Sequence, residues 1–170
     1  MRKRRPSRAV PVPEPGEGKR GEEGHLGYLL RQAGVAFRAR AERALSDVDV
    51  TLPQFAVLTM VAAYPGLSNA DLARLSLLTP QTVSVIVANL KRSGALASRP
   101  HAVHGRIRQL ALTQTGEDIL ARCKRRVGAI EAELAAGLSG NEQRAIRQWL
   151  VRVAIDNAAA ARKRGRISSD

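Results

Sequence analysis

The most constraining feature of the sequence is a pair of helix-start signals that lie close together in its middle. Ser68-Asn69-Ala70-Asp71 predicts a short helix that ends near Ser76. Thr79-Pro80-Gln81-Thr82 predicts a second helix, which ends at Gly94. Only Leu77-Leu78 lies between the two helices. Two helices joined by so tight a connection are typical of a helix-turn-helix, whose second helix enters the major groove of DNA.

The second of these helices has two chemically different faces. Its apolar positions share the face that is expected to pack inward: Val83, Ile86, Val87 and Leu90. The other face carries short or hydrogen-bonding side chains near the helix start: Gln81, Thr82, Ser84, Val85 and Ala88. Glutamine can pair with adenine through two hydrogen bonds, and valine can contact the thymine methyl group. These residues alone fit an ordinary amphipathic helix about equally well.

A predicted β-hairpin follows the second helix. Residues 96–99 and 107–112 have strand-like patterns, and His101-Ala102-Val103-His104-Gly105 lies between them. Its arginines are candidates for DNA contacts, by insertion into the minor groove: Arg99, Arg106 and Arg108. The alternative is an exposed hairpin whose charges only prevent aggregation through its edges. A hairpin directly after a helix-turn-helix favours the DNA-binding interpretation, because the two together form a winged helix-turn-helix.

The remaining segments predict a mainly α fold. Long helices are expected over about residues 25–46 and 114–158, and Thr51 begins a further helix that runs through Ala63. The long helices are rich in Ala and Leu, and a monomer would leave much of their apolar surface exposed. We therefore expect them to be dimerisation helices of a homodimer, with a compact monomer as the less favoured alternative. The DNA-binding lobe is expected over about residues 51–113.

The charge balance points to a polyanionic partner. The chain of 170 residues has 28 Lys and Arg against 15 Asp and Glu, a net charge of +13. Residues 1–23 contain four prolines and are expected to form a disordered basic arm, residues 24–160 the folded domain, and residues 161–170 a basic tail. Aromatic residues make up only 3%, which favours duplex DNA over single strands. No membrane span or signal peptide is expected, and a single cysteine fits a reducing cytoplasm.

The sequence resembles the MarR family, the multiple-antibiotic-resistance regulators, over roughly residues 25–158. The resemblance is carried by five segments in register: 52–58 (LPQFAVL), 68–73 (SNADLA), 79–84 (TPQTVS), 90–99 (LKRSGALASR), and Gly105-Arg106 followed by 112–116 (LTQTG). It implies a dimer, and Arg106 matches the wing-tip arginine that enters the minor groove. The residues that match family positions approaching DNA are Pro80, Gln81, Thr82, Ser84 and Val85. One departure is His104, which stands where the family usually has an aspartate that braces this arginine.

The family resemblance also implies a small aromatic or phenolic effector bound between the dimerisation helices and the DNA-binding lobe. His25, Tyr28, Arg31 and Tyr64 are possible polar contacts for it, but they are equally ordinary surface residues, so the effector site stays unassigned. Cys123 is expected to be structural rather than an oxidation sensor. The three histidines lack ligand spacing, so neither a metal nor a cofactor is expected.

The expected function is therefore that of a dimeric, sequence-specific transcriptional regulator from a bacterium. It would most simply repress by binding a pseudo-palindromic operator. An architectural protein that binds DNA without strong sequence preference is the alternative that the basic ends and the net charge support. An enzyme is not expected, because no catalytic constellation is present and no length remains for a catalytic domain.

Overall fold

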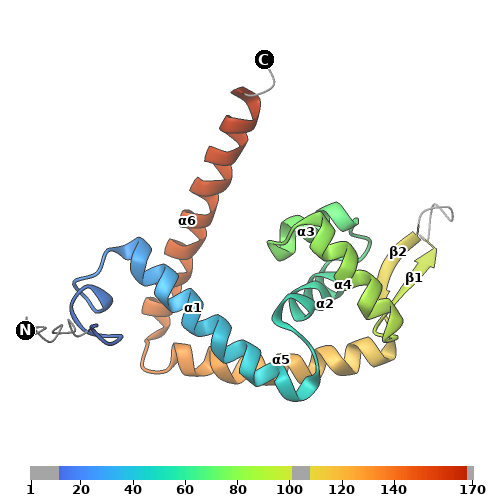
Figure 1. Ribbon diagram of the computed structural model, residues 1–170, viewed down its shortest axis with the longest axis horizontal. Helices are drawn as coiled ribbons and strands as arrows, with labels where there is room; N and C mark the ends of the chain where they lie inside the picture. The colour runs from blue at the N-terminus through green and yellow to red at the C-terminus, as the bar shows by residue number, and fades with distance from the viewer. Residues whose placement is uncertain (1–11, 101–107, 168–170) are drawn as a thin grey trace, which may run out of the picture. The chain divides into compact units, whose positions relative to one another are not determined.

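The computed structural model describes residues 12–100 and 108–167 of the chain. These residues are mainly helical and include one antiparallel sheet of two strands (Figure 1). The chain divides into two compact units between Val127 and Gly128, and each unit is described by itself. The mainly α, winged helix-turn-helix fold predicted from the sequence is confirmed.

The first unit contains the predicted DNA-binding lobe. Its α-helices are α1 (Leu26–Leu45), α2 (Leu52–Ala63), α3 (Asn69–Ser76), α4 (Pro80–Arg92) and the first part of α5 (Gln114–Ala135). Two short 3-10 helices, η1 (Gly18–Arg20) and η2 (Ser46–Val48), precede and follow α1. Strands β1 (Leu96–Pro100) and β2 (Arg108–Leu112) pair so that Leu96 lies opposite Leu112. Figure 1 shows α2, α3 and α4 gathered together, with the hairpin beside the end of α4.

Hydrogen bonds from side chains fix where the helices of this lobe begin. The Thr51 hydroxyl accepts from the backbone N–H of Gln54 at 3.3 Å, and the Gln54 side chain accepts from the N–H of Thr51 at 2.8 Å. The hydroxyls of Ser68 and Thr79 likewise accept from the backbone N–H groups of Asp71 and Thr82 at the starts of α3 and α4, without the return bond. Each cap satisfies a backbone donor that the first helical turn leaves without a partner. The predicted starts of all three helices are confirmed.

One continuous apolar core holds the first unit together. Leu45, Val57, Leu58, Leu72 and Val83 are completely buried, and they come from α1, α2, α3 and α4. Leu96 from β1 and Leu120 from α5 belong to the same core. Because every element of the lobe contributes to one core, the exposed side of α4 is held at a fixed position relative to the hairpin.

The segment before α1 differs from the unstructured arm expected over residues 1–23. Residues 1–11 lie outside the described part, but residues 12–24 form turns and η1, which contacts α1. The Gln32 side chain accepts from the Arg20 guanidinium at 3.3 Å and donates to the backbone oxygen of Arg20 at 3.0 Å. This reciprocal pair orders a proline- and glycine-rich segment that has no apolar periodicity of its own.

The second unit consists of the end of α5 and of α6 (Gly140–Ile167). Ser139 and Glu142 form a capping box at the start of α6: the Ser139 N–H donates to Glu142 Oε2 at 2.7 Å, and the Glu142 N–H donates to the Ser139 hydroxyl at 3.3 Å. The Gln143 side chain donates to the backbone oxygen of Leu138 at 3.1 Å and so holds the turn before α6. Helix α6 continues through residues 161–167, which were expected to be a tail beyond the helical domain.

Within the described residues, no single helix has both the length and the apolar composition to cross a membrane. Residues Leu26–Val48 and Leu52–Ala63, which meet at a bend of 81°, pass that test only as a pair and only by length and composition.

Candidate nucleic-acid interface

The first turns of α4 present an exposed face, as the sequence predicts for a recognition helix. Val83, Ile86, Val87 and Leu90 are buried, whereas Val85 is 61% exposed. The other predicted contact residues on this helix are also exposed: Pro80, Gln81, Thr82 and Ser84. The expected division of α4 into an inner and an outer face is therefore confirmed. The exposed residues lie in the first turns of α4, near the positive end of the helix dipole.

Hydrogen bonds divide the exposed residues of α4 into two groups. The Ser84 hydroxyl donates to the backbone oxygen of Pro80 at 2.9 Å, and the hydroxyls of Thr79 and Thr82 lie 2.8 Å apart. By contrast, the Gln81 side chain makes no hydrogen bond within the part of the chain that the structure describes. Gln81 therefore has both its amide donor and its carbonyl acceptor available for a base edge.

The turn between α3 and α4 is held in an uncommon backbone conformation. Leu77 has φ 56° and ψ 39°, in the left-handed region that favours glycine, and its side chain is 91% exposed. The backbone N–H of Leu78 donates to the oxygen of Ala73 at 2.9 Å, which closes the end of α3. The sharp turn between α3 and α4 therefore depends on the strained backbone of one leucine, Leu77.

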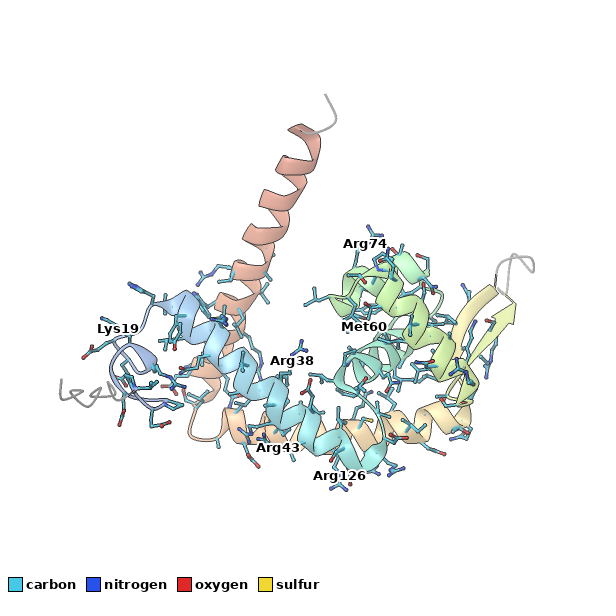
Figure 2. The ribbon with its side chains drawn as sticks, in the orientation of Figure 1. Lys19, Arg38, Arg43, Met60, Arg74 and Arg126 are labelled. Carbon is cyan, nitrogen blue, oxygen red and sulfur yellow. The ribbon has the colours of Figure 1, made fainter. Side chains whose placement is uncertain are left out.

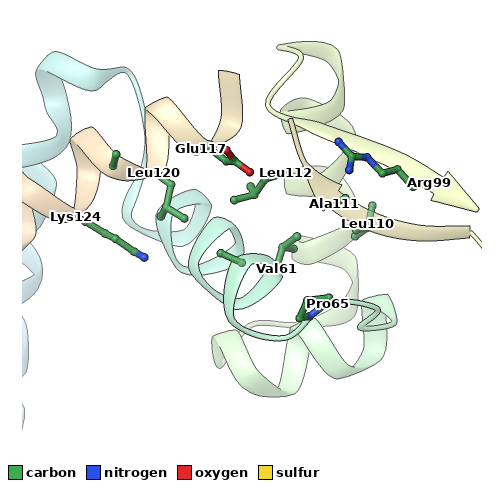
Figure 3. A pocket seen from close by; sticks show the side chains of 11 residues that line it. Val61, Pro65, Arg99, Leu110, Ala111, Leu112, Glu117, Leu120 and Lys124 are labelled. Atoms are coloured by element: carbon green, nitrogen blue, oxygen red, sulfur yellow. The ribbon is translucent and has the colours of Figure 1, made fainter. Parts of the chain in front are cut away.

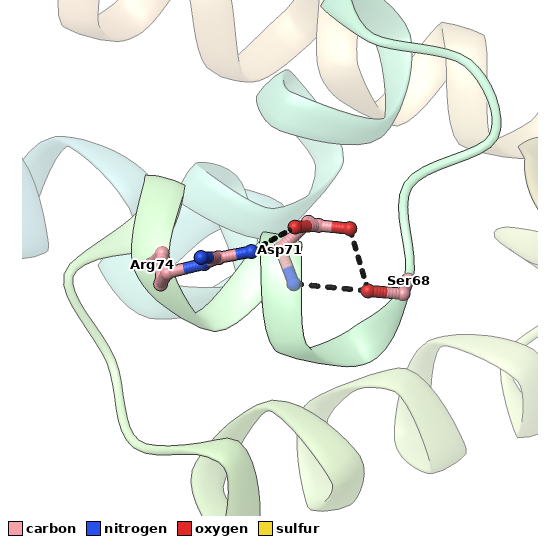
Figure 4. Close-up of polar contacts among 3 residues, drawn as sticks. All are labelled: Ser68, Asp71 and Arg74. Carbon is pink, nitrogen blue, oxygen red and sulfur yellow. Dashed lines mark hydrogen bonds and ion pairs between the residues drawn. The ribbon is translucent and has the colours of Figure 1, made fainter.

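An ordered polar group lies at the start of α3 (Figure 4). The Ser68 hydroxyl donates to Asp71 Oδ2 at 2.6 Å, and the Asp71 N–H donates back to the Ser68 hydroxyl at 3.1 Å. The Arg74 guanidinium pairs with the same carboxylate. The Ser68 hydroxyl, followed by Arg74, lowers the pKa of the Asp71 carboxyl below its ordinary value of 3.8.

The hairpin carries the second group of predicted DNA contacts. Arg99 is exposed in β1, and Arg108 lies in β2 opposite Pro100. Arg106, the predicted minor-groove residue, and its neighbour His104 lie outside the described residues. The Lys91 ammonium in α4 donates to the Ser98 hydroxyl in β1 at 2.6 Å. Nothing in the local sequence signals that contact, because it depends on how the hairpin folds back.

The hairpin is joined to α5 through Thr113. Its hydroxyl donates to the backbone oxygen of Gly94 at 2.6 Å and accepts from the N–H of Gly116 at 3.1 Å. A Cβ atom at Gly116 would lie 2.1 Å from the backbone oxygen of Ala95, so this position requires glycine. The base of the hairpin and the start of α5 therefore form one closely packed junction.

An open pocket of about 450 Å³ lies between α2, the hairpin and α5 (Figure 3). Its wall is mostly apolar and includes Val61, Leu110, Leu112 and Leu120. Three charged side chains also line it: Arg99 from β1, and Glu117 and Lys124 from α5. No pattern in the sequence predicts this pocket, because its lining comes from three separate segments. None of the four residues that it named as possible effector contacts (His25, Tyr28, Arg31 and Tyr64) lines the pocket.

The single cysteine and the three histidines are the two further groups named from the sequence. Cys123 is completely buried, and burial raises the pKa of its thiol, which disfavours the reactive thiolate. In the described part of the chain, no three His, Cys, Asp or Glu side chains lie close enough to hold a metal ion. His101 and His104 are outside that part.

Comparison with known proteins identifies the family of this fold. The MarR family profile matches residues 48–107, which include α2, α3, α4 and β1. The HTH-type transcriptional repressor Rv2887 of Mycobacterium tuberculosis is 34% identical over 135 residues, which cover 79% of this chain and 97% of the relative.

Two crystal structures of the Mycobacterium tuberculosis MarR family protein Rv2887 are also similar to this chain. The complex with DNA has a TM-score of 0.62 at 34% identity and covers 76% of this chain and 98% of that one. The complex with p-aminosalicylic acid has a TM-score of 0.63 at 33% identity, with coverage of 77% and 99%. The chain therefore belongs to the MarR family of winged helix-turn-helix transcriptional regulators.

Proposed function

We propose that this protein is a homodimeric transcriptional repressor that binds a pseudo-palindromic DNA site and releases it in response to a small aromatic acid. The observation that carries the proposal is the exposed start of α4 beside the β1–β2 hairpin, on a lobe with a single core. A related repressor has been crystallised with DNA, which supports the same use of this surface. When the protein binds a site within a promoter, it blocks transcription from that promoter.

Within this proposal, base edges are read from α4 and the backbone is held by the hairpin. Gln81 and Val85 contact bases, while the hydroxyls of Thr82 and Ser84 and the ring of Pro80 lie close to the groove wall. Arg99 and Arg108 bind phosphates, and Arg106 enters the minor groove. Phosphate contacts position the protein, so sequence preference depends mainly on α4.

Dimerisation is supported by apolar side chains that single units leave exposed. Leu26 and Val35 on α1 are 68% and 61% exposed, and Val151 and Ile155 on α6 are 56% and 60% exposed. A second copy that covers these faces would bury them from water. Two-fold symmetry would then place the two α4 helices about 34 Å apart, one turn of DNA.

The pocket between α2, the hairpin and α5 is the proposed effector site. Its apolar wall suits an aromatic ring, and Arg99 and Lys124 suit a carboxylate. A related MarR family protein has been crystallised with p-aminosalicylic acid. Because Arg99, Leu110 and Leu112 belong to the hairpin, an acid bound there would bear directly on the position of the wing.

The proposed role is non-catalytic and cytoplasmic, since a repressor of this kind acts by occupying DNA. The second candidate is an architectural protein that binds any duplex, and the net charge of +13 favours it. The two candidates differ in sequence preference and not in their contact with phosphate.

The deciding experiment selects the preferred duplex from random sequences and compares its affinity with that of an unrelated duplex at equal salt. We expect the selected duplex to bind at least a hundredfold more tightly. Gln81→Ala should then cost about 1–3 kcal/mol on the selected duplex and little on the unrelated one. Arg106→Ala should weaken both duplexes. Equal affinity of the unaltered protein for the two duplexes would support the architectural candidate.

A further inference from the structure

One face of α5 forms a wall of the effector pocket, and its two ends carry opposite charges. The residues of this face are Glu117, Leu120, Ala121 and Lys124, spaced so that they lie on the same side of the helix. Glu117 and Lys124 are separated by about 10 Å along the axis, from a rise of 1.5 Å per residue. Figure 3 shows Glu117 beside Leu112, with Leu120 between Glu117 and Lys124.

Neither charge at the ends of this wall is committed to a partner. The side chains of Glu117 and Lys124 make no hydrogen bond or ion pair with any residue that the structure describes. The neighbouring carboxylate of Asp118 differs, because it accepts from the Gln114 side chain at 3.1 Å and does not line the pocket. The α5 wall therefore offers one cation and one acceptor with apolar surface between them.

This arrangement fits a ligand that is itself polar at both ends. A carboxylate near Lys124 would gain a charge-assisted hydrogen bond, while the aromatic ring would lie over Leu120. A group para to the carboxylate is the part of a single ring that reaches farthest toward Glu117. If that group is an N–H or O–H donor, the Glu117 carboxylate gains a partner. If the position is bare, the ring removes water from this carboxylate and leaves it without one.

We propose that Glu117 determines effector specificity, so that the pocket prefers aromatic acids with an amino or hydroxyl group para to the carboxylate. The proposal rests on the effector site proposed above, and it adds the chemical class that the site selects. Lys124 contributes affinity for every carboxylate alike. Arg99, on the hairpin wall, is not needed for the preference between para-substituted and unsubstituted acids.

The preference can be measured by calorimetric titration of the full chain with benzoate, 3-aminobenzoate, 4-aminobenzoate and 4-hydroxybenzoate. We expect the two para-substituted acids to bind about tenfold more tightly than benzoate, the size of a hydrogen bond to a charged group. The affinity for the meta isomer, 3-aminobenzoate, should be close to the affinity for benzoate. Glu117→Met should bring all four affinities together, because it removes the acceptor and keeps a good helix former. Lys124→Met should weaken all four and leave their ranking unchanged.

Asp118→Met is the matched control, since it removes a neighbouring carboxylate from the same helix outside the pocket. It should leave both the affinities and their ranking unchanged. A para preference that survives in Glu117→Met, or wild-type protein that binds benzoate as tightly as 4-aminobenzoate, overturns the proposal and leaves the effector site intact. If the wild-type protein binds none of the four acids, the proposed effector site fails together with this preference, while DNA recognition is judged by the duplex comparison alone.

Discussion

The Lys91 ammonium in α4 and the Ser98 hydroxyl in β1 are joined by a hydrogen bond of 2.6 Å. This bond connects the last turn of the recognition helix to the first strand of the hairpin. Below it, Thr113 ties the base of the hairpin to the start of α5. The two parts of the lobe that are proposed to contact DNA are therefore linked by polar contacts on the surface as well as by the shared core.

Removal of the Lys91–Ser98 bond is expected to weaken DNA binding more than it weakens the fold. Ser98→Ala removes the bond and keeps the charge, and it should cost about 0.5–1.5 kcal/mol in binding to the selected duplex. Lys91→Met removes both the bond and the charge, so its loss should be larger and the salt dependence of binding should also fall.

Arg92→Met is the control for charge alone, because Arg92 is exposed at the same end of α4. It should reduce the salt dependence as Lys91→Met does, with a smaller loss of affinity at a fixed salt concentration. Equal losses for Lys91→Met and Arg92→Met, with none for Ser98→Ala, would show that the bond does not position the hairpin. Fluorescence anisotropy at several salt concentrations measures all three variants.

Leu77→Asn is expected to stabilise the protein by about 1 kcal/mol. Leu77 adopts a left-handed conformation that disfavours leucine and suits asparagine, and its 91% exposure means that little packing is lost. Leu75→Asn is the matched control, because Leu75 is also exposed but lies within α3. It should destabilise by about 0.5 kcal/mol or more, since asparagine is a poorer helix former than leucine. Urea unfolding of both variants is the measurement, and a destabilised Leu77→Asn would mean that the leucine side chain has a packing role.

The local parts of the fold were predictable from the sequence because they depend on local interactions. The caps at Thr51, Thr79 and Ser139 each use a hydroxyl and a backbone N–H three residues later. Such a contact can form whatever the rest of the chain does. For the same reason the apolar spacing within α4 identified its buried face. The ends of α2, α3 and α4 consequently agree with the expected ranges to within two residues.

The contacts that were not predicted join residues far apart in the sequence. The guanidinium of Arg126 in α5, which Figure 2 labels, pairs with the carboxylate of Asp47 in η2. Arg20 and Gln32 pair between the N-terminal segment and α1. The candidate effector pocket has the same origin, since Leu110 and Lys124 line one pocket only after the hairpin and α5 have packed. Charge and polarity can be counted in a sequence, but the partner of each charge depends on tertiary structure.

The contribution of Asp71 to stability is expected to disappear in acid. Hydrogen bonds from Ser68 and the charge of Arg74 lower the pKa of this carboxyl in the folded state below 3.8. A lowered folded pKa means that the stabilisation is complete above the unfolded pKa and is lost as the pH falls through the folded one. Wild-type protein should therefore have a higher melting temperature than Asp71→Asn at pH 7, and the difference should shrink as the pH falls below 3.8. A difference in melting temperature that persists unchanged to pH 3 would show that the ionised carboxylate is not its source.

Gly66 and Gln109 are expected to be coupled in stability. Gly66 has φ +90°, and a Cβ atom there would lie 2.5 Å from Nε2 of the Gln109 side chain in β2. Gly66→Ala should destabilise the protein for two reasons, backbone strain and contact with this side chain. Gln109→Ala removes the contact with the side chain but leaves the backbone strain at position 66 unchanged. Gly66→Ala should therefore cost less in a Gln109→Ala background than in the wild type, by about 0.5–1 kcal/mol in a double-mutant cycle.

The size of that coupling measures how firmly β2 is held against the loop between α2 and α3. The end of the Gln109 side chain is flexible, so a strand that can shift would relieve the contact and bring the coupling close to zero. A coupling of the expected size means that the strand stays in place, so binding of Gly66→Ala to the selected duplex should change little, whereas a coupling close to zero should come with weaker binding because the hairpin has shifted. Gly137→Ala is the control for strain alone, since Gly137 has φ +81° and no atom lies within 4 Å of its added Cβ. It should destabilise the fold without any coupling to Gln109. If Gly66→Ala and Gly137→Ala were coupled equally to Gln109→Ala, the coupling would arise in the unfolded chain and would not report contact with the hairpin.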